Sequence, residues 1–220
     1  MILEICAANY QSAINAEKAG AQRIELCENL SVGGITPKLH LLQQILNKLS
    51  IPVFVLIRPR AGNFVYTDDE FELMKDDIQR CKNSGCHGIV SGALLEDNSI
   101  DVEKTKKLIN ISNPLPFTFH RAFDMTPDPI KSLEQLIDLG VDRILTSGQQ
   151  LSAAEGISII KMLNKKAINK ITILPGAGIN PNNAKLFKQA GLHEIHASAT
   201  GNDSVSNVDT IKAILESINA

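Results

Sequence analysis

The sequence predicts a single-domain α/β protein, a (β/α)8 or TIM barrel that spans residues 1–220. Eight short apolar runs alternate with eight segments of helical hydrophobic spacing, as expected for a closed barrel of this length. One local pattern also recurs four times: a helical stretch stops at a glycine, and a strand begins two or three residues later, at Gly20, Gly85, Gly140 and Gly191. An open doubly wound sheet is the alternative, and the recurrence of this pattern to the end of the chain favours closure.

The expected strands and helices alternate regularly along the chain. Four strands are apolar runs at residues 2–6, 52–57, 117–120 and 171–174, and the others centre on Ile24, Ile89, Ile144 and Ile195. The helices are expected at residues 10–20, 38–48, 69–84, 102–111, 129–139, 153–163, 181–190 and 208–218. Ser152 with Glu155 resembles a capping box, and Asn180 before Pro181 resembles a cap followed by a first-turn proline.

Composition excludes several classes of function. A chain of 220 residues can bury roughly 70% of its unfolded surface, which is enough for one core. The net charge of −2 and the pI near 6.2 predict no general attraction to nucleic acid or anionic lipid. There is no apolar stretch of membrane-spanning length and no secretion leader at the first residues, so we expect a cytoplasmic protein. Its four cysteines should then be free thiols.

The first predicted strand–helix–strand unit gathers unusual side chains. Glu4 and Cys6 lie on one face of the first strand, and Glu25 and Cys27 lie on one face of the second. Because the two strands of such a unit run parallel and their carboxyl ends open onto the same side, these faces should meet. Two carboxylates and two thiols would then point toward a common centre.

The carboxyl ends of the other strands add further polar side chains. In a barrel of this class these ends form the functional mouth. The residues expected there are Arg58, Arg60, His120, Arg121, Ser147, Gly176, Gly178, His196 and Ser198. Alternation along the strands turns Arg58, His120 and His196 inward if their faces are the inner ones. The alternative is a buried polar network that only closes the top of the barrel, although an apolar plug would do so without a desolvation cost.

Two loops are candidates for ligand contacts. Residues 58–69 can form a lid, or a solvated loop that caps the helix after it. The turn at residues 175–179 contains Gly176 and Gly178, whose backbone N–H groups can face an anion together with Ser198, as in barrel phosphate sites. Glycines that serve only a tight turn are the alternative.

The cysteines divide into two pairs. Cys81 and Cys86 lie in a helix and at a strand entrance, where cysteine is usually a small apolar filler. Cys6 and Cys27 lie at matching heights on neighbouring strands, which are about 4.8 Å apart. Two thiolates are too few for structural zinc but suit Cu(I) at low coordination number. Two buried thiols without a ligand are the alternative.

Motifs along nearly the whole chain resemble the CutC copper homeostasis family. The most distinctive are the His-Arg-Ala-Phe-Asp block at residues 120–124 and the Thr-Ser-Gly-Gln block at residues 146–149. Others are Glu-Leu-Cys at residues 25–27, Arg-Pro-Arg-Ala-Gly at residues 58–62 and Pro-Gly-Ala-Gly at residues 175–178. The resemblance implies a cytosolic (β/α)8 barrel associated with copper, in which Cys6 and Cys27 correspond to the family's proposed Cu(I) pair. Many members carry an extra segment after the eighth strand, whereas here residues 198–204 lead almost directly to the last helix.

Two functional hypotheses follow. In the first, the protein is a copper homeostasis protein that binds Cu(I) through Cys6 and Cys27, with no other cofactor. In the second, it is an enzyme for a small anionic metabolite, phosphorylated or not: Arg58 and Arg121 hold the anion, and Glu25 or His120 moves protons. Glu4, Arg60, Ser147, His196, Ser198 and the two glycines of the turn would complete that site. A homodimer is also expected, because the outer helices of such barrels often form dimer interfaces, although no apolar surface patch in the sequence identifies one.

Overall fold

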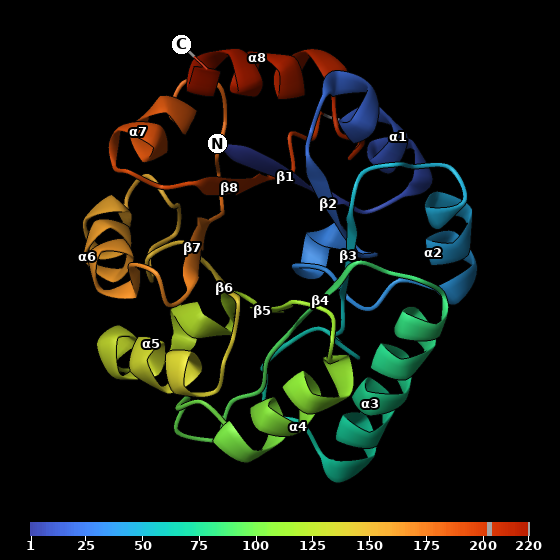
Figure 1. The fold of residues 1–220 in the computed structure, drawn as a ribbon, viewed down its shortest axis with the longest axis vertical. Coiled ribbons are helices and arrows are strands. Elements are labelled where there is room, and N and C mark those ends of the chain that lie inside the picture. The colour runs from blue at the N-terminus through green and yellow to red at the C-terminus, as the bar shows by residue number, and fades with distance from the viewer. Residues whose placement is uncertain (202–203, 220) are drawn as a thin grey trace.

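The computed structural model describes residues 1–201 and 204–219, and these form a barrel of eight parallel strands within a ring of eight helices (Figure 1). The sheet order is β7-β6-β5-β4-β3-β2-β1-β8, and β8 lies beside β7 to complete the ring. The strands are β1 (Ile2–Ala7), β2 (Arg23–Leu26), β3 (Val53–Leu56), β4 (Gly88–Ser91), β5 (Phe117–Phe119), β6 (Arg143–Thr146), β7 (Thr172–Pro175) and β8 (Glu194–Ala197). The predicted fold class is therefore confirmed.

The helices cover the outside of the barrel. They are α1 (Tyr10–Ala19), α2 (Leu39–Leu46), α3 (Asp68–Asn83), α4 (Val102–Ser112), α5 (Pro129–Asp138), α6 (Ile157–Ala167), α7 (Ala184–Gln189) and α8 (Val208–Asn219). Two short 3₁₀ helices, η1 (Leu30–Val32) and η2 (Arg121–Met125), follow β2 and β5. None of the described helices is both long and apolar enough to cross a membrane.

Two predicted helix starts were wrong. The capping-box bonds between Ser152 and Glu155 do form, but they close a turn, and α6 begins only after Gly156. Gly156 is packed so tightly against the backbone of Ser147 that a Cβ atom would lie 1.9 Å from its carbonyl oxygen. Likewise Asn180 caps a turn, and α7 begins at Ala184. At α6 the turn before the helix packs against the loop after β6, whereas at α7 the bonds that hold the turn are local to residues 178–183.

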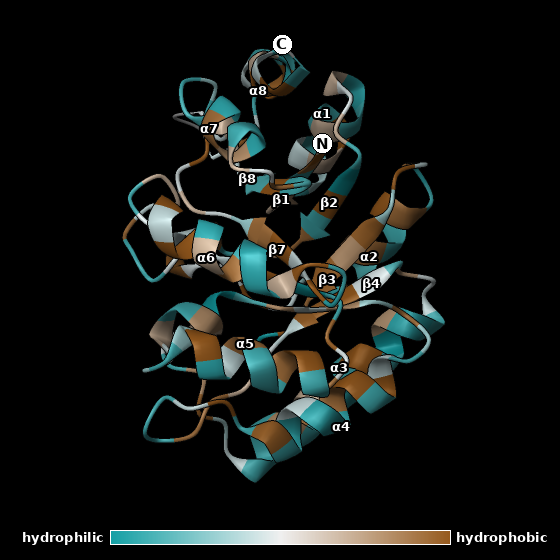
Figure 2. Ribbon diagram, turned by 60° about the vertical axis from the view of Figure 1, so that its left-hand side comes forward, coloured by the Kyte–Doolittle hydropathy of each residue, from teal (hydrophilic) through white to brown (hydrophobic). Residues whose placement is uncertain are grey.

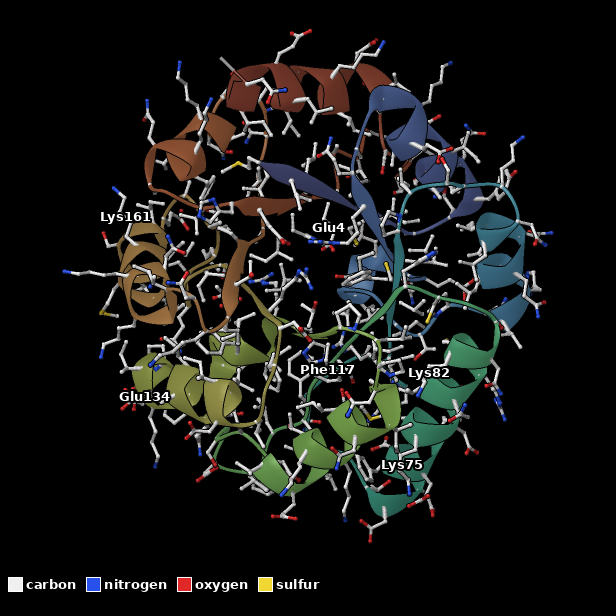
Figure 3. All side chains as sticks on the ribbon, viewed as in Figure 1. Glu4, Lys75, Lys82, Phe117, Glu134 and Lys161 are labelled. Atoms are coloured by element: carbon white, nitrogen blue, oxygen red, sulfur yellow. The ribbon has the colours of Figure 1, made fainter. Side chains whose placement is uncertain are left out.

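The two faces of the strands bury different chemistry. Outward-facing side chains such as Ile5, Ile24 and Val55 are apolar and fully buried beneath the helices. Figure 2 shows the complementary pattern on the helices, where hydrophobic and hydrophilic residues alternate along each coil. The inward-facing side chains include Glu4, which lies inside the ring in Figure 3, whereas Glu134 and Lys161 lie on the outer helices. The polar residues inside the barrel therefore need a separate explanation.

Of the short segment after β8, residues 202 and 203 (Asn202 and Asp203) lie outside the described residues, as does Ala220. On either side of them, Thr200 and Ser206 form an isolated antiparallel bridge, and Ser206 also bonds to Ser12 of α1. The described part of this segment thus lies against the first helix.

Candidate functional site

The amino-terminal half of the barrel interior is filled by four charged residues, here named the charged plug: Glu4, Arg23, Arg143 and Glu194. Arg23 donates to Glu4 at 2.5 Å and also to Glu194, and Arg143 donates to Glu194 at 3.0 Å. Both guanidinium groups also stack on the ring of Phe54. Since buried charges are tolerated only when paired, this balanced set of two cations and two anions closes the lower barrel.

Above the plug, Glu4, Glu25 and His196 bring their ligand atoms within 4.8 Å of one another. His196 Nδ1 donates to Glu4 at 2.7 Å and lies 3.9 Å from Glu25 Oε2. This cluster follows from the strand register, in which Glu4 of β1 is the partner of both Arg23 in β2 and His196 in β8.

The two carboxyl groups of this cluster have opposite electrostatic environments. Burial alone would raise the pKa of Glu4, but the hydrogen bond from His196 and the charge of Arg23 outweigh it and lower the pKa to about 2. Burial raises the pKa of Glu25 to about 7, because the attraction of His196 is too weak to compensate. Burial would lower the pKa of His196, yet its contacts with the carboxylates raise it. Glu4 is thus a fixed anion, while Glu25 can exchange a proton near neutral pH.

Cys6 and Cys27 meet beside this cluster, as alternation predicted. Their sulfur atoms are 3.6 Å apart, both side chains are buried, and no disulfide joins them. The contact with Cys27 and burial raise the pKa of the Cys6 thiol well above its ordinary value. Gly34, with φ of +85°, lies directly over Cys27, and a Cβ atom there would come within 3.3 Å of the sulfur and 2.8 Å of Leu56. A glycine at this point lets the loop after β2 close over the thiols.

Arg58 lies at the end of β3 and organises the loops around it. Its Nη1 donates to the carbonyl oxygens of Val32 and Gly34 at 2.9 Å, and its Nη2 donates to that of Gly62 at 2.8 Å. The buried Nε has no hydrogen-bond partner among the described residues. The guanidinium also stacks over Phe64, 4.9 Å from the ring centroid.

His120 follows directly after β5 and also packs against Phe64, with their ring centroids 4.7 Å apart. Its Nδ1 accepts a hydrogen bond from the backbone N–H of Ala122 at 3.3 Å, while its buried Nε2 is without a partner in the described part of the chain. Burial and the charge of Arg58 lower the pKa of His120 to about 3. The imidazole is therefore neutral at physiological pH, and the bond at Nδ1 assigns its proton to Nε2.

A cavity of about 240 Å³, here named the mouth cavity, opens at the carboxyl ends of the strands. Eight of the residues predicted for the site line it: Cys6, Glu25, Arg58, His120, Arg121, Gly178, His196 and Ser198. A larger cavity of about 680 Å³ lies at the opposite end of the barrel, and it is lined by residues 140–142, Asn164, residues 167–173, Gly191 and His193. That cavity is lined mainly by turn residues, and it contains none of the buried polar atoms that lack a partner.

Five of the predicted site residues do not line the mouth cavity. Glu4 belongs to the charged plug, and Cys27 lies fully buried behind Cys6. Arg60 is bound to Glu70 and to loop carbonyl oxygens. Ser147 bonds to Asp124 and to the carbonyl oxygen of Gln150. Gly176 packs against Leu145, where a Cβ atom would come within 2.6 Å of the side chain.

Several residues of this region were not predicted from the sequence. Asp124 of η2 accepts bonds from Thr146, Ser147 and Arg121, so it holds the loops after β5 and β6 together and neutralises Arg121. Phe64 contacts both Arg58 and His120 and comes from a loop with no periodic pattern. Asp124 does carry a signal, since it belongs to the distinctive block at residues 120–124.

The glycine turn after β7 reaches the mouth cavity, and its binding of an anion stays a prediction. Gly178 lines the mouth cavity with φ of +72°, and the neighbouring Ala177 also has a positive φ, of 87°. The carbonyl oxygen of Gly178 accepts from the side chains of Asn180 and Asn183, so the turn is held from outside. The structure thus places the turn at the cavity wall, beside Ser198.

Comparison with known proteins gives consistent matches. The sequence profile of the CutC family matches residues 1–201. The human protein named copper homeostasis protein cutC homolog is 49% identical over 199 residues, which are 90% of this chain and 73% of that protein. CutC from Pasteurella multocida is 48% identical over 202 residues, 91% of this chain and 83% of that protein. The solved structure of CutC from Streptococcus agalactiae is 38% identical with a TM-score of 0.85, covering 90% of this chain and 98% of that one.

Proposed function

The chain belongs to the CutC family, and on this premise we propose that it binds Cu(I) as cargo through the thiolates of Cys6 and Cys27 at the mouth of the barrel. The proposal includes a cytoplasmic location, where the thiols stay reduced. A role in copper homeostasis agrees with the name of the human relative. Homodimer formation stays a prediction.

The observation that carries the proposal is the pair of free sulfur atoms 3.6 Å apart. Metal–thiolate bonds are about 2.3 Å long for a first-row ion such as zinc, so two of them can span this separation with one ion between. Soft thiolates select Cu(I) over the hard cations that carboxylates prefer. Because Cys6 also lines the mouth cavity, an ion can approach the pair from solvent.

Binding would displace protons. The raised pKa of Cys6 means that this thiol is protonated in the metal-free protein, and thiolate formation must accompany coordination. The metal affinity should therefore rise with pH. Two thiolates and one Cu(I) carry a net charge of −1, which is compatible with a mouth where the Arg58 charge lies.

The test is a Cu(I) competition titration against a chromophoric chelator under reducing conditions. We expect the double variant Cys6→Ala/Cys27→Ala to lose the high-affinity site. The matched control is Cys81→Ala/Cys86→Ala, which removes the other two buried cysteines and should leave Cu(I) affinity unchanged. Unchanged affinity in the first variant would remove the copper proposal, whereas equal losses in both would point to non-specific thiol binding.

An enzyme that acts on a small anionic metabolite is the second candidate. The observation that favours it is a set of three buried polar atoms without partners in residues that line one cavity: Glu25 Oε2, Arg58 Nε and His120 Nε2. A copper site made by two thiolates leaves these atoms unused. Unsatisfied buried polar groups are rare in proteins and each calls for an explanation, of which a missing ligand is one.

A further inference from the structure

The mouth cavity contains a buried positive charge that the protein does not neutralise. Of the six arginines in the sequence, Arg23, Arg60, Arg80, Arg121 and Arg143 each have a carboxylate within 4 Å among the described residues. Arg58 is only 6% exposed, and no such ion pair is found for it within the described ranges. Its acceptors are three backbone carbonyl oxygens, and the buried Tyr66 hydroxyl also interacts with it; these groups solvate the charge but do not cancel it. An anion in the cavity would supply the missing charge.

Two residues that line the cavity each carry a buried hydrogen-bond donor without a partner among the described residues. Arg58 Nε–H and His120 Nε2–H belong to side chains that are 6% and 4% exposed, and both lack a partner among the described residues. Both side chains contact Phe64, with distances to its ring centroid of 4.9 Å for Arg58 Cζ and 4.7 Å for the His120 ring. Because the imidazole is neutral and protonated on Nε2, it donates a hydrogen bond without adding a second positive charge.

The rest of the lining describes the ligand further. Leu56, Leu145 and Ile179 line the cavity with apolar surface. Glu25, from β2, is 5% exposed and adds Oε2, a polar atom without a hydrogen-bond partner among the described residues. The cavity therefore offers donors for an oxyanion, an apolar stretch, and a carboxyl group that suits a hydroxyl, since a hydroxyl can both donate and accept.

We propose that the mouth cavity binds a short-chain hydroxy-monocarboxylate, with its carboxylate held by Arg58 Nε and His120 Nε2 and its hydroxyl by Glu25. The inference specifies the ligand class of the second candidate function and rests on it, and it does not depend on copper. A carboxylate carries one negative charge, which matches the single unneutralised arginine. A phosphate monoester carries close to two charges at neutral pH and would leave one of them buried without a counter-charge.

Binding is tested in copper-free, reducing buffer by thermal shift and calorimetry with defined probes. The probes are lactate, 3-hydroxybutyrate and 4-hydroxybutyrate. The controls are butyrate, which lacks the hydroxyl, 1,3-butanediol, which lacks the charge, and inorganic phosphate, which is the alternative oxyanion. We expect at least one hydroxy acid to bind saturably and to raise the melting temperature by about 5 °C or more at 100 times its Kd. Butyrate should bind more weakly, and the diol should not bind.

His120→Asn tests the assignment of the donor. Asparagine is a good residue at the start of a short helix and can keep the bond from Ala122 N–H, but it does not reach as far as Nε2. Loss of a buried hydrogen bond to a charged group should weaken the probe affinity about 10- to 100-fold. His40→Asn, at an exposed position of α2, is the matched control and should change nothing.

Ser198→Phe serves as an independent variant if the asparagine variant does not fold. Ser198 is a half-buried residue of the cavity lining, so a large side chain there should block the hydroxy acid without removing a buried polar group. The inference is overturned if no monocarboxylate binds saturably, if phosphate binds more tightly than every carboxylate, or if His120→Asn binds the probe as the wild type does. The Cu(I) affinity of the wild-type protein is measured in parallel. If the wild type binds the hydroxy acid but not Cu(I), only the copper proposal is removed.

Discussion

The charged plug and the mouth cavity, which form the two halves of the barrel interior, differ in whether their buried charges have partners. In the charged plug every residue has an oppositely charged partner, as with Arg23 between Glu4 and Glu194. In the mouth cavity, a few ångströms above, Glu25, Arg58 and His120 each keep a buried atom without a partner among the described residues. Arg143 Nη1 in the plug also has no hydrogen-bond partner in the described part of the chain, but its guanidinium is paired with Glu194. Polarity alone therefore does not identify a site, since both halves are polar and the mouth differs in holding a buried arginine, Arg58, with no ion pair among the described residues.

The contrast has a physical basis in the cost of desolvation. A buried charge is stable when a partner and hydrogen bonds compensate its loss of water, so the plug can hold the barrel together without a ligand. An incomplete set of donors and acceptors is destabilising by itself, and such sets are typical of functional sites. Variants of the plug should therefore affect stability, and variants of the mouth should affect binding.

The largest expected effect is on stability, from Arg23→Met. Removal of this guanidinium leaves Glu4 and Glu194 as buried carboxylates with fewer partners, and we expect a loss of about 3–5 kcal/mol in the free energy of unfolding. Urea denaturation followed by circular dichroism measures it. Arg80→Met is the matched control, because Arg80 is exposed and its pair with Asp77 is long, so its loss should stay below about 1 kcal/mol.

The second effect is the acid sensitivity caused by His120. Its pKa is about 3 in the folded protein against 6.5 ordinarily, so protons bind the unfolded state first as the pH falls below 6.5. Stability should therefore decrease on acidification, by on the order of 2–3 kcal/mol between pH 6.5 and 4.5. The difference between wild type and His120→Asn isolates this contribution, because Glu25 titrates in both proteins. Parallel stability curves for the two would contradict the burial of a neutral imidazole.

The smallest expected effect on stability is that of Glu25→Gln, compared at pH 8 with the same substitution at the neighbouring Glu4. The pKa of Glu25 is raised to about 7, so its ionised form destabilises the folded protein above that pH, and Glu25→Gln should be within about 1 kcal/mol of wild type or more stable. The pKa of Glu4 is lowered to about 2, so its ionised form stabilises the fold above pH 4.5. Glu4→Gln should thus be the less stable variant in chemical denaturation. If Glu25→Gln were instead the less stable variant, Glu25 rather than Glu4 would be the carboxylate that stabilises the fold, which would contradict the division into plug and mouth.

Much of this arrangement could be predicted from the sequence because it depends on local rules. Alternation along two adjacent parallel strands placed Glu4 and Cys6 opposite Glu25 and Cys27, and the structure confirms the contact between the two sulfur atoms. The same rule turns Arg23, which shares the parity of Glu25 within β2, toward the barrel interior. The charged plug was therefore within reach of sequence analysis.

The rest depends on loops, whose side chains follow no period. Arg60 and Ser147 come directly after strands, but the first is held by Glu70 and the second by Asp124, so neither points into the cavity lining. Phe64 contacts two site residues from the middle of a loop. Which donors would remain without partners could not be predicted, because that depends on the complete set of tertiary contacts.

The most direct test of the mouth as the binding end is X-ray absorption spectroscopy of the protein loaded with one equivalent of Cu(I). We predict a first coordination shell that contains two sulfur atoms, which disappears from the spectrum of the Cys6→Ala/Cys27→Ala variant and persists in Cys81→Ala/Cys86→Ala. A shell made only of nitrogen and oxygen atoms, or a sulfur shell unaffected by loss of Cys6 and Cys27, would contradict the account.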